Sequence, residues 1–267
     1  MIHAEPVEAH DIERAKTLFL RDGYVAVANA FTPGQLAKAR EGVKRVVDEQ
    51  TQATKQEDAN RGFARYSFGN QSHHAEWAML IDLPTILPIV DAIWGSENYS
   101  CSGAGGDYSL PGAKIQALHS DMGDFFADPL GQVNFRDIPA PFIVVNFLTT
   151  DFRVDNGAIR FIPGTQRSRA PIPSLDDEPN WMMENHLCAP AGTAIVRDVR
   201  CWHGGTPNLS DGPRVMTSVG YFAPWYANNS GPVLPRALYD TLSERGKRLS
   251  RFIVETDVHP FKAPKVG

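Results

Sequence analysis

Between about residues 97 and 226, short runs rich in β-branched and aromatic residues alternate with turns made of Gly, Pro, Asn and Asp. The runs are "AKIQALHSD" (113–121), "PFIVVNFLTTDF" (141–152), "GAIRFIPGT" (157–165), "GTAIVRDV" (192–199) and "RVMTSVGYFAP" (214–224). Many short strands bounded by turn signals are typical of an antiparallel sandwich or jelly roll. The strand–helix alternation of a dinucleotide-binding fold is absent, and the glycines of "CSGAGGDYSLPG" (101–112) lack the spacing and the following helix of a phosphate-binding loop.

The first third of the sequence favours helices. "EAHDIERAKTLFLRDG" (8–23) has apolar residues on one face and ends at a glycine, and "YVAVANAF" (24–31) predicts a short strand. A second helix is expected over 32–50, with Thr32 as its N-cap and Pro33 at its first position. A third is expected over 83–95, with Pro84 in its first turn and Pro88 disturbing it, and a last one around 235–252.

The length of 267 residues fits one large domain. We therefore expect a single domain over 1–267. Its mostly helical part, 1–96, packs on a β core formed by 97–226, and 227–267 form a C-terminal extension with a helix. The chain is expected to act as a monomer or homodimer.

The composition argues against several classes of protein. The formal net charge is −5 and the pI is about 5.9, so the basic surplus of a nucleic-acid-binding protein is missing. The N-terminus has no apolar core of a secretory signal, and no apolar stretch approaches the roughly 18–20 residues that a membrane span needs. Three widely spaced cysteines without a C-x-x-C motif argue against a disulfide scaffold. We expect a cytoplasmic protein without nucleic-acid or membrane partners.

Two histidines differ in context from the other six. His119 closes the strand-like run "AKIQALH", and His203 follows the strand-like run "TAIVRDVRCW". Because residues i and i+2 of a strand share a face, His119 and Asp121 can point inward together, and His203 can join them from a distant strand. Two histidines and one carboxylate with open positions suit non-haem Fe(II). An H-x-D motif alone is weak evidence, since it also arises by chance.

The sequence after His203 strengthens the metal hypothesis. Two glycines follow this histidine, as expected at a tight turn where the backbone passes close to other atoms, and Arg214 begins the next strand-like run. An arginine fork binds a carboxylate through two hydrogen bonds, which suits the far end of a dicarboxylate that chelates a metal. The competing interpretation of Arg214 is a surface salt bridge, for example with Asp211.

At this point the sequence resembles the phytanoyl-CoA dioxygenase-like family of Fe(II)/2-oxoglutarate-dependent oxygenases. The matching pieces are "HSD" (119–121), "DNGAIRFIPGTQ" (155–166), "APAGTAIVRDVRCWHGGTPN" (189–208) and "GPRVMTSVGYFAPW" (212–225), in the order of the family and within residues 15–226. The resemblance implies a mainly β fold with flanking helices around a double-stranded β-helix (jelly roll, cupin-like) core.

The resemblance also implies the roles of individual residues. His119, Asp121 and His203 would be the iron ligands, Arg214 would bind the distal carboxylate of 2-oxoglutarate, and Gln116 matches a position that contacts this cosubstrate in some members. The expected activity uses Fe(II), 2-oxoglutarate and O₂, releases succinate and CO₂, and hydroxylates, desaturates, epoxidises or cyclises a small molecule. Asp121 argues against halogenation, because related halogenases have a small residue there.

The sequence departs from the family at two positions that are not metal ligands. Ile159 stands where relatives often have threonine or another small residue, and Gln166 stands where many have histidine. These departures affect the expected cosubstrate contacts and the branch of the family, not the iron site.

The substrate pocket is expected to draw on "RYSFGNQSHHAEW" (65–77) and "MGDFFADPLGQVNF" (122–135), with Phe68, Asn70, Phe125, Phe126 and Phe222 as candidate contacts. These phenylalanines also suit a plain hydrophobic core. The loops lack a Lys/Arg cluster for coenzyme A phosphates, so we expect a free secondary metabolite or amino-acid derivative. Two other functions stay open: a cupin-like metal enzyme without 2-oxoglutarate, and a non-catalytic β-barrel that binds small molecules.

Overall fold

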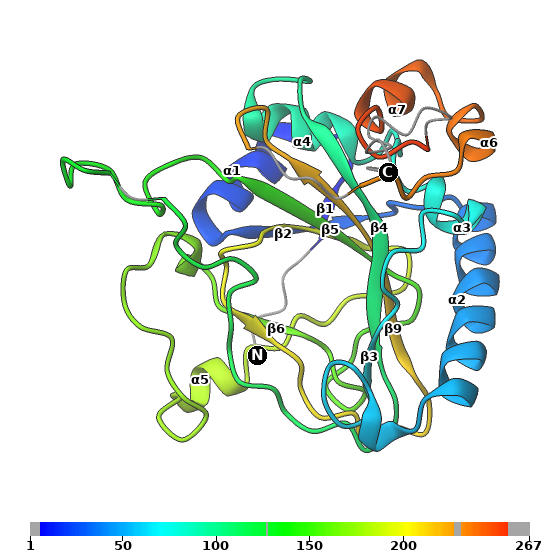
Figure 1. Cartoon of the computed structure of the whole chain (residues 1–267). Coiled ribbons are helices and arrows are strands. Elements are labelled where there is room, and N and C mark those ends of the chain that lie inside the picture. The colour runs from blue at the N-terminus through cyan, green and yellow to red at the C-terminus, as the bar shows by residue number, and fades with distance from the viewer. Residues whose placement is uncertain (1–5, 127, 227–230, 256–267) are drawn as a thin grey trace, which may run out of the picture.

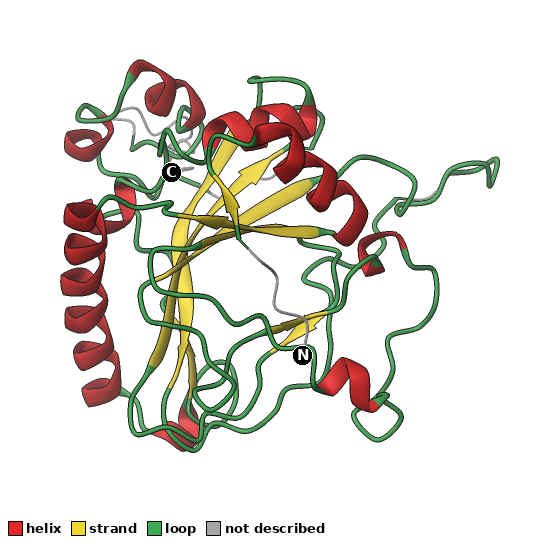
Figure 2. Cartoon of the chain, turned by 180° about the vertical axis from the view of Figure 1, so that it is seen from behind, coloured by secondary structure: helices red, strands yellow, loops and turns green. Residues whose placement is uncertain are grey.

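The computed structural model of the chain describes residues 6–126, 128–226 and 231–255. Two β-sheets face each other, as Figures 1 and 2 show. The large sheet has the strand order β1-β2-β7-β5-β9-β4-β3, and the small sheet pairs β6 with β8. The strands are β1 (Val7–Glu8), β2 (Tyr24–Ala28), β3 (Arg65–Ser67), β4 (Ser100–Ser109), β5 (Phe142–Leu148), β6 (Arg160–Phe161), β7 (Ala194–Asp198), β8 (His203–Gly204) and β9 (Arg214–Phe222). This is the mainly β, cupin-like architecture that the sequence predicts.

Strand β4, which lies between β9 and the edge strand β3, is not predicted by the sequence patterns. Glycines rarely favour strands, yet β4 contains Gly103, Gly105 and Gly106 and pairs along its length with β9. A Cβ atom on Gly105 would overlap the carbonyl of Gly69, and one on Gly106 would overlap the carbonyl of Met216. The glycines are therefore needed because neighbouring backbone lies directly against this strand.

The segment that ends in the H-x-D motif pairs with β8 but is not a regular strand. The Gln116 N–H donates to Gly205 O (2.9 Å), and His119 and His203 exchange two backbone hydrogen bonds (2.9 and 3.0 Å). Gly204 lies within β8 rather than in a tight turn, which corrects the sequence-based expectation. The expected close approach is nevertheless present, since a Cβ atom on Gly204 would lie 3.1 Å from the Gln116 carbonyl oxygen.

The two long N-terminal helices are confirmed. Helix α1 (Ile12–Asp22) is capped by Asp11 and ends at Gly23, whose φ of 85° suits glycine. Helix α2 (Pro33–Ala53) begins with a capping box between Thr32 and Gln35. In Figure 2, α2 lies along the outside of the large sheet.

The later helices differ from the expectations in their bounds. Helix α4 (Leu87–Trp94) begins after Pro84 and takes Pro88 into its first turn, where the missing N–H has no cost, so Pro88 does not disturb it. In place of one helix over 235–252 there are α6 (Arg236–Tyr239) and α7 (Glu244–Leu249), the latter capped by Ser243. Short helical turns complete the set: α3 (Ala75–Ala78), α5 (Asn180–Met183), η1 (Gln56–Asp58) and η2 (Thr165–Arg167).

The main hydrophobic core lies between the helices and the outer face of the large sheet, and it includes Trp77, Val145 and Phe147. The region before residue 97, expected to be mostly helical, also supplies β1, β2 and β3 to the large sheet. The inner faces of the two sheets enclose the polar site described below. Over the described residues, no helix combines the length and apolar character needed to cross a bilayer.

Candidate metal centre

His119, Asp121 and His203 converge between the two sheets. One potential ligand atom from each lies within 4.8 Å of the others. The backbone pairing of His119 with His203 brings the two rings side by side, with centroids 4.4 Å apart. Asp121 follows two residues after His119 and its side chain reaches the same point, although Asp121 itself lies in a bend rather than in a strand.

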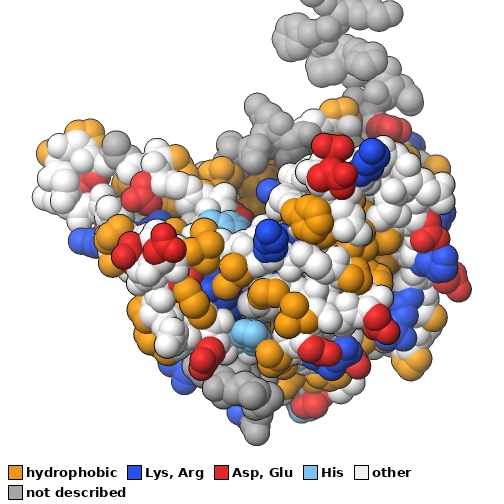
Figure 3. Space-filling view, turned by 90° about the horizontal axis from the view of Figure 1, so that it is seen from below, with side chains coloured by type: hydrophobic (Ala, Val, Ile, Leu, Met, Phe, Trp, Pro, Cys, Tyr) orange, Lys and Arg blue, Asp and Glu red, His pale blue; other side chains and the backbone are white. Residues whose placement is uncertain are grey.

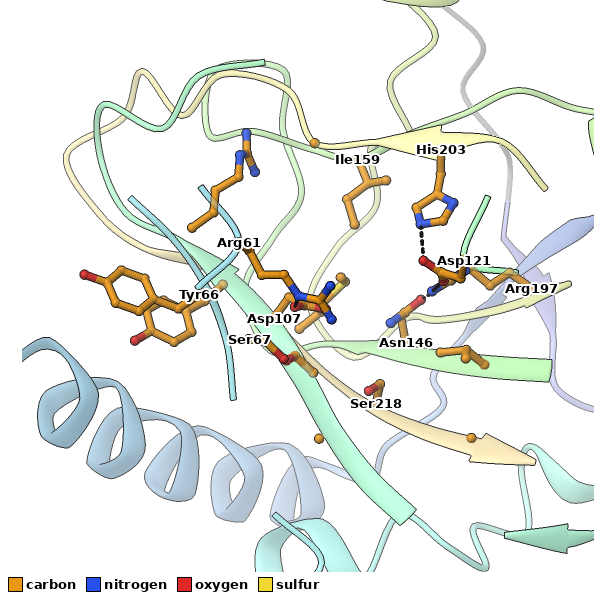
Figure 4. Close-up of a pocket in the computed structure, with 18 of the residues that line it drawn as sticks. Arg61, Tyr66, Ser67, Asp107, Asp121, Asn146, Ile159, Arg197, His203 and Ser218 are labelled. Carbon is orange, nitrogen blue, oxygen red and sulfur yellow. Dashed lines mark hydrogen bonds and ion pairs between the residues drawn. The ribbon is translucent and has the colours of Figure 1, made fainter. Parts of the chain in front are cut away.

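Hydrogen bonds on the outer nitrogens orient both histidine rings. Nδ1 of His119 lies 3.2 Å from Ala117 O, and Nδ1 of His203 lies 3.0 Å from Cys201 O. The Nε2 atoms of both rings face Asp121 Oδ1, at 3.8 Å from His119 and 3.5 Å from His203. Figure 4 shows the contact between His203 and Asp121. This places an unprotonated Nε2 on each ring toward the carboxylate, which is how metal-binding histidines are normally oriented. The donor set of two imidazoles and one carboxylate fits Fe(II).

The charges around the three ligands favour their metal-binding protonation states. Burial lowers the pKa of His203, so its ring is neutral at neutral pH. Burial alone would raise the pKa of Asp121, but the positive charge of Arg197 holds it well below its usual range. No proton therefore has to leave these two residues before a metal binds at neutral pH.

The three residues line a cavity of about 490 Å³, which we call the main cavity. Its floor is the inner face of β4, β5 and β9, where Gly103, Gly105 and Gly220 leave room. Its polar walls include Arg61, Asn70, Asp107, Gln116, Asn146, Arg197, Arg214 and Ser218. The cavity is large enough for a small dicarboxylate beside the metal position.

Arg214, the first residue of β9, carries a buried charge that forms no ion pair within the described part of the chain, although the charge of Asp107 acts on it. The side chain is 3% exposed and lies over the Phe152 ring, 5.0 Å from its centroid. Its Nε and Nη1 atoms have no hydrogen-bond partner among the described residues, and no ion pair with Asp211 is formed there. Burial and the nearby Arg65 lower the pKa of Arg214. A buried, unpaired guanidinium in a cavity wall is a site for an anion.

Gln116 also lines the main cavity, but its amide is engaged with backbone. Oε1 accepts a hydrogen bond from Gly205 N (3.1 Å), and Nε2 donates to Arg61 O (3.3 Å). The side chain thus ties the segment before His119 to the glycines after His203.

The candidate substrate residues separate into three environments. Phe68 is 2% exposed and packs against Trp77 and Tyr108 in the main core, outside the lining of the main cavity. Asn70 lines the main cavity beside Gly103. Phe125 and Phe126 are 51% and 43% exposed, on the segment after Asp121 that projects at the left of Figure 1.

A second hollow, which we call the aromatic recess, adjoins the metal ligands. It has a volume of about 550 Å³ and is lined by Asp121, Met122, Gly123, Asp124, Phe125, Phe142, Phe222 and Tyr226. The Tyr226 ring lies 5.3 Å from that of Phe125 and 5.4 Å from that of Phe222. Asp121 and Phe142 line both hollows, so the aromatic recess meets the main cavity beside the metal ligands.

The sequence patterns missed several residues of the site. Arg197 lies within an apolar strand-like run, so the charged residue inside "TAIVRDV" was the available signal. Arg65 is buried and donates to the carbonyls of Lys114 and Thr206. Asp107 lies near Arg61, with 3.7 Å between Oδ1 and Nε. Nothing in the sequence order brings these residues together, because they meet only when the sheets form.

Of the two residues that depart from the family pattern, Ile159 and Gln166, one lines the main cavity and the other lies outside it. Ile159 lines the main cavity and adds an apolar surface there. Gln166 lies outside it, where Nε2 donates to Leu20 O (3.1 Å) and ties the 3₁₀ turn η2 to the end of α1.

The comparisons with known proteins agree with this geometry. A sequence profile for the family described as Phytanoyl-CoA dioxygenase (PhyH) matches residues 19–216. Among solved structures, the epimerase SnoN in complex with Fe³⁺, alpha-ketoglutarate and nogalamycin RO is 18% identical, with a TM-score of 0.60 over 80% of this chain and 84% of SnoN.

Two further structures have the same fold. HygX from Streptomyces hygroscopicus, solved with nickel, 2-oxoglutarate and hygromycin B, is 14% identical, with a TM-score of 0.63 over 83% of this chain and 91% of HygX. AviO1 from Streptomyces viridochromogenes Tue57 is 18% identical, with a TM-score of 0.60 over 82% of this chain and 97% of AviO1.

Proposed function

The chain belongs to the phytanoyl-CoA dioxygenase (PhyH) family of non-haem Fe(II)/2-oxoglutarate-dependent enzymes, and from this premise we propose that it oxidises a free small molecule, a secondary metabolite or an amino-acid derivative. The proposed products are succinate, CO₂ and a substrate that is hydroxylated, desaturated, epoxidised or cyclised.

One observation carries this proposal: the three ligands and the unpaired Arg214 line the same cavity. His119, Asp121 and His203 would hold Fe(II), which supplies the O₂-dependent redox chemistry. The ligands already have the required orientation and charge, so the protein binds the ion without rearranging them. The polar walls of the main cavity then receive the dicarboxylate.

Arg214 is the proposed partner of the C5 carboxylate of 2-oxoglutarate. Its Nε and Nη1 lack partners among the described residues, and a carboxylate would neutralise its buried charge. Gln116 is proposed to line this cosubstrate site. Its amide oxygen accepts a hydrogen bond from Gly205 N and so holds the segment before His119 against Gly205. These two residues orient the cosubstrate without taking part in proton transfer.

The aromatic recess is the proposed place of the primary substrate. Phe125 and Phe222 offer ring faces next to Asp121, and Phe126 extends the same segment. Asn70 offers an amide from the side of the main cavity. Phe68 is not one of the proposed substrate contacts, because it packs in the main core. A ligand here lies beside the metal ligands while Arg214 holds the cosubstrate.

The arginines of the main cavity do not form a free cluster for coenzyme A phosphates. Arg65 donates to backbone carbonyls, Arg197 pairs with Asp121, and Arg214 is the proposed carboxylate site. Arg61 lies near Asp107. A free small molecule is the better candidate, and the printed ligands of SnoN and HygX, nogalamycin RO and hygromycin B, are free small molecules.

The test is succinate release from 2-oxoglutarate over a panel of metabolites, with Fe(II) and O₂ present. A substrate is expected to raise succinate release and to yield a product that has gained one oxygen atom or lost two hydrogens. Asp121→Ala is the matched control and is expected to abolish both signals. Turnover that persists without 2-oxoglutarate, or that survives Arg214→Ala, would instead identify a cupin-like enzyme that needs no cosubstrate.

A further inference from the structure

The two oxygens of Asp121 have different partners. Oδ1 faces the Nε2 atoms of His119 and His203. Oδ2 accepts a hydrogen bond in a 2.7 Å ion pair with Nη2 of Arg197, as Figure 4 shows. One oxygen is thus directed to the metal position and the other to a guanidinium.

Arg197 is itself held in place by the sheet. It lies on β7, is 7% exposed, and its Nε donates to Asn146 Oδ1 (3.0 Å) on the neighbouring strand β5. Asn146 is 2% exposed. Asp121, in contrast, lies in an irregular segment with its side chain 35% exposed. The strand pair β5–β7 therefore supplies a fixed partner for a carboxylate that lies outside any strand.

Arg197 has fewer contacts with the surrounding fold than the neighbouring buried Arg200. The buried Arg200 uses Nε and Nη2 on Asp198 and Nη1 on the carbonyls of Phe135 and Ile138. Arg197 contacts Asp121 and Asn146, and its Nη1 has no partner among the described residues. An arginine retained for packing alone normally has its buried donors satisfied.

We propose that Arg197 is a positioning residue that keeps Asp121 Oδ2 off the metal, so that Asp121 binds through Oδ1 alone. The inference rests on the proposed function in that the three ligands hold a divalent metal. A carboxylate that binds through both oxygens takes an additional coordination position. Reaction with 2-oxoglutarate and O₂ needs the positions that the three protein ligands leave open.

Charge gives this role a signature that a structural role lacks. A guanidinium next to a ligand repels a divalent cation, so its removal favours metal binding. Arg197→Met is expected to bind Mn²⁺ at least as tightly as the wild type but to leave fewer positions for other ligands. A residue that only supports the fold would show the opposite, a weaker metal site and a lower melting temperature.

The experiment is water-proton relaxation of the full chain loaded with Mn²⁺ alone, without cosubstrate. Three protein ligands leave about three water positions on a six-coordinate ion, so the relaxation enhancement of Arg197→Met is expected to fall by about one third. Arg197→Lys keeps a donor for Oδ2 and is expected to retain the wild-type value. Arg200→Met, which removes an equally buried arginine from another carboxylate, is the matched control and is also expected to retain it.

The measured enhancements separate the role of Arg197 from the proposed function. An unchanged enhancement in Arg197→Met, or an equal fall in Arg200→Met, overturns the role of Arg197 while leaving the proposed function intact. Failure of the wild-type protein to bind Mn²⁺ overturns both. If Arg197→Met does not fold, Asn146→Leu releases the Nε end of the guanidinium; a lower enhancement then supports the role, and a wild-type value contradicts it.

Discussion

The Arg214 guanidinium is buried, and its Nε and Nη1 atoms have no hydrogen-bond partner among the described residues. A charge buried in a cavity wall without a counter-ion is costly, and a bound carboxylate removes that cost. Arg214→Met is expected to weaken 2-oxoglutarate binding by about 3 kcal/mol, roughly 100-fold, as for the loss of one partner of a buried charge pair. Arg214→Lys offers a point charge in place of a planar fork, so its affinity for 2-oxoglutarate is expected to lie between those of the wild type and Arg214→Met.

Calorimetric titration of the Mn²⁺-loaded protein with 2-oxoglutarate measures this effect. Arg153→Met is the control, because Arg153 pairs with Asp155 on the surface with its side chain 54% exposed. Equal 2-oxoglutarate affinity in Arg214→Met and the wild type would rule out Arg214 as the carboxylate partner.

At the scale of elements, the glycines of β4 bring the strands close enough to form the cavity floor. Gly106 has a φ of 133°, and a Cβ atom there would overlap the backbone of Met216 on β9. Gly106→Ala is expected to lower the free energy of unfolding by at least about 2 kcal/mol. Gly34→Ala, in the open first turn of α2 with no atom within 4 Å of its Cβ position, is expected to be neutral or stabilising. Urea unfolding compares the two, and equal stabilities would contradict the close approach of β4 and β9.

The small sheet depends on a buried ion pair. Arg160 pairs with Glu178, with both side chains fully buried, and also donates to the Gln116 carbonyl three residues before His119. Glu178→Gln leaves the Arg160 charge uncompensated and is expected to cost about 3–5 kcal/mol of stability. The double variant Arg160→Met/Glu178→Leu is expected to recover most of that loss in thermal unfolding. A double variant less stable than Glu178→Gln would show that the pair itself stabilises the fold.

Local sequence patterns predicted the elements whose formation depends on residues close to one another in the sequence. Caps such as Thr32 located the helices. The i, i+2 spacing of His119 and Asp121 led to the correct expectation that the two side chains lie close together, although the segment is not a regular strand. Strand β4 was not predicted, because its glycines are required by backbone that is distant in sequence. Arg197 was missed for a similar reason: its partners Asp121 and Asn146 lie on other segments. Phe68 lies just after β3, in a segment whose local pattern does not distinguish a core residue from a pocket residue.

At the scale of the whole molecule, positively and negatively charged side chains are interspersed over the face shown in Figure 3. Inside the molecule, His119, Asp121 and His203 converge in an arrangement that could hold a metal ion. Metal binding to the folded state alone stabilises it, by about 2.7 kcal/mol at a concentration of 100 times the Kd. Mn²⁺ is therefore expected to raise the melting temperature by several degrees in the wild type and to leave Asp121→Ala unchanged. A similar shift in both proteins, measured by differential scanning calorimetry, would indicate that the ion binds elsewhere.

The joint binding of metal and cosubstrate is tested by an anaerobic titration of the Fe(II)-loaded protein with 2-oxoglutarate, followed by visible absorption. We expect a weak charge-transfer band that saturates with 2-oxoglutarate, is absent in His119→Ala, and needs a much higher cosubstrate concentration in Arg214→Met. A wild-type protein that binds Fe(II) but develops no such band at saturating 2-oxoglutarate would contradict the central claim that this cavity holds the metal and the cosubstrate together.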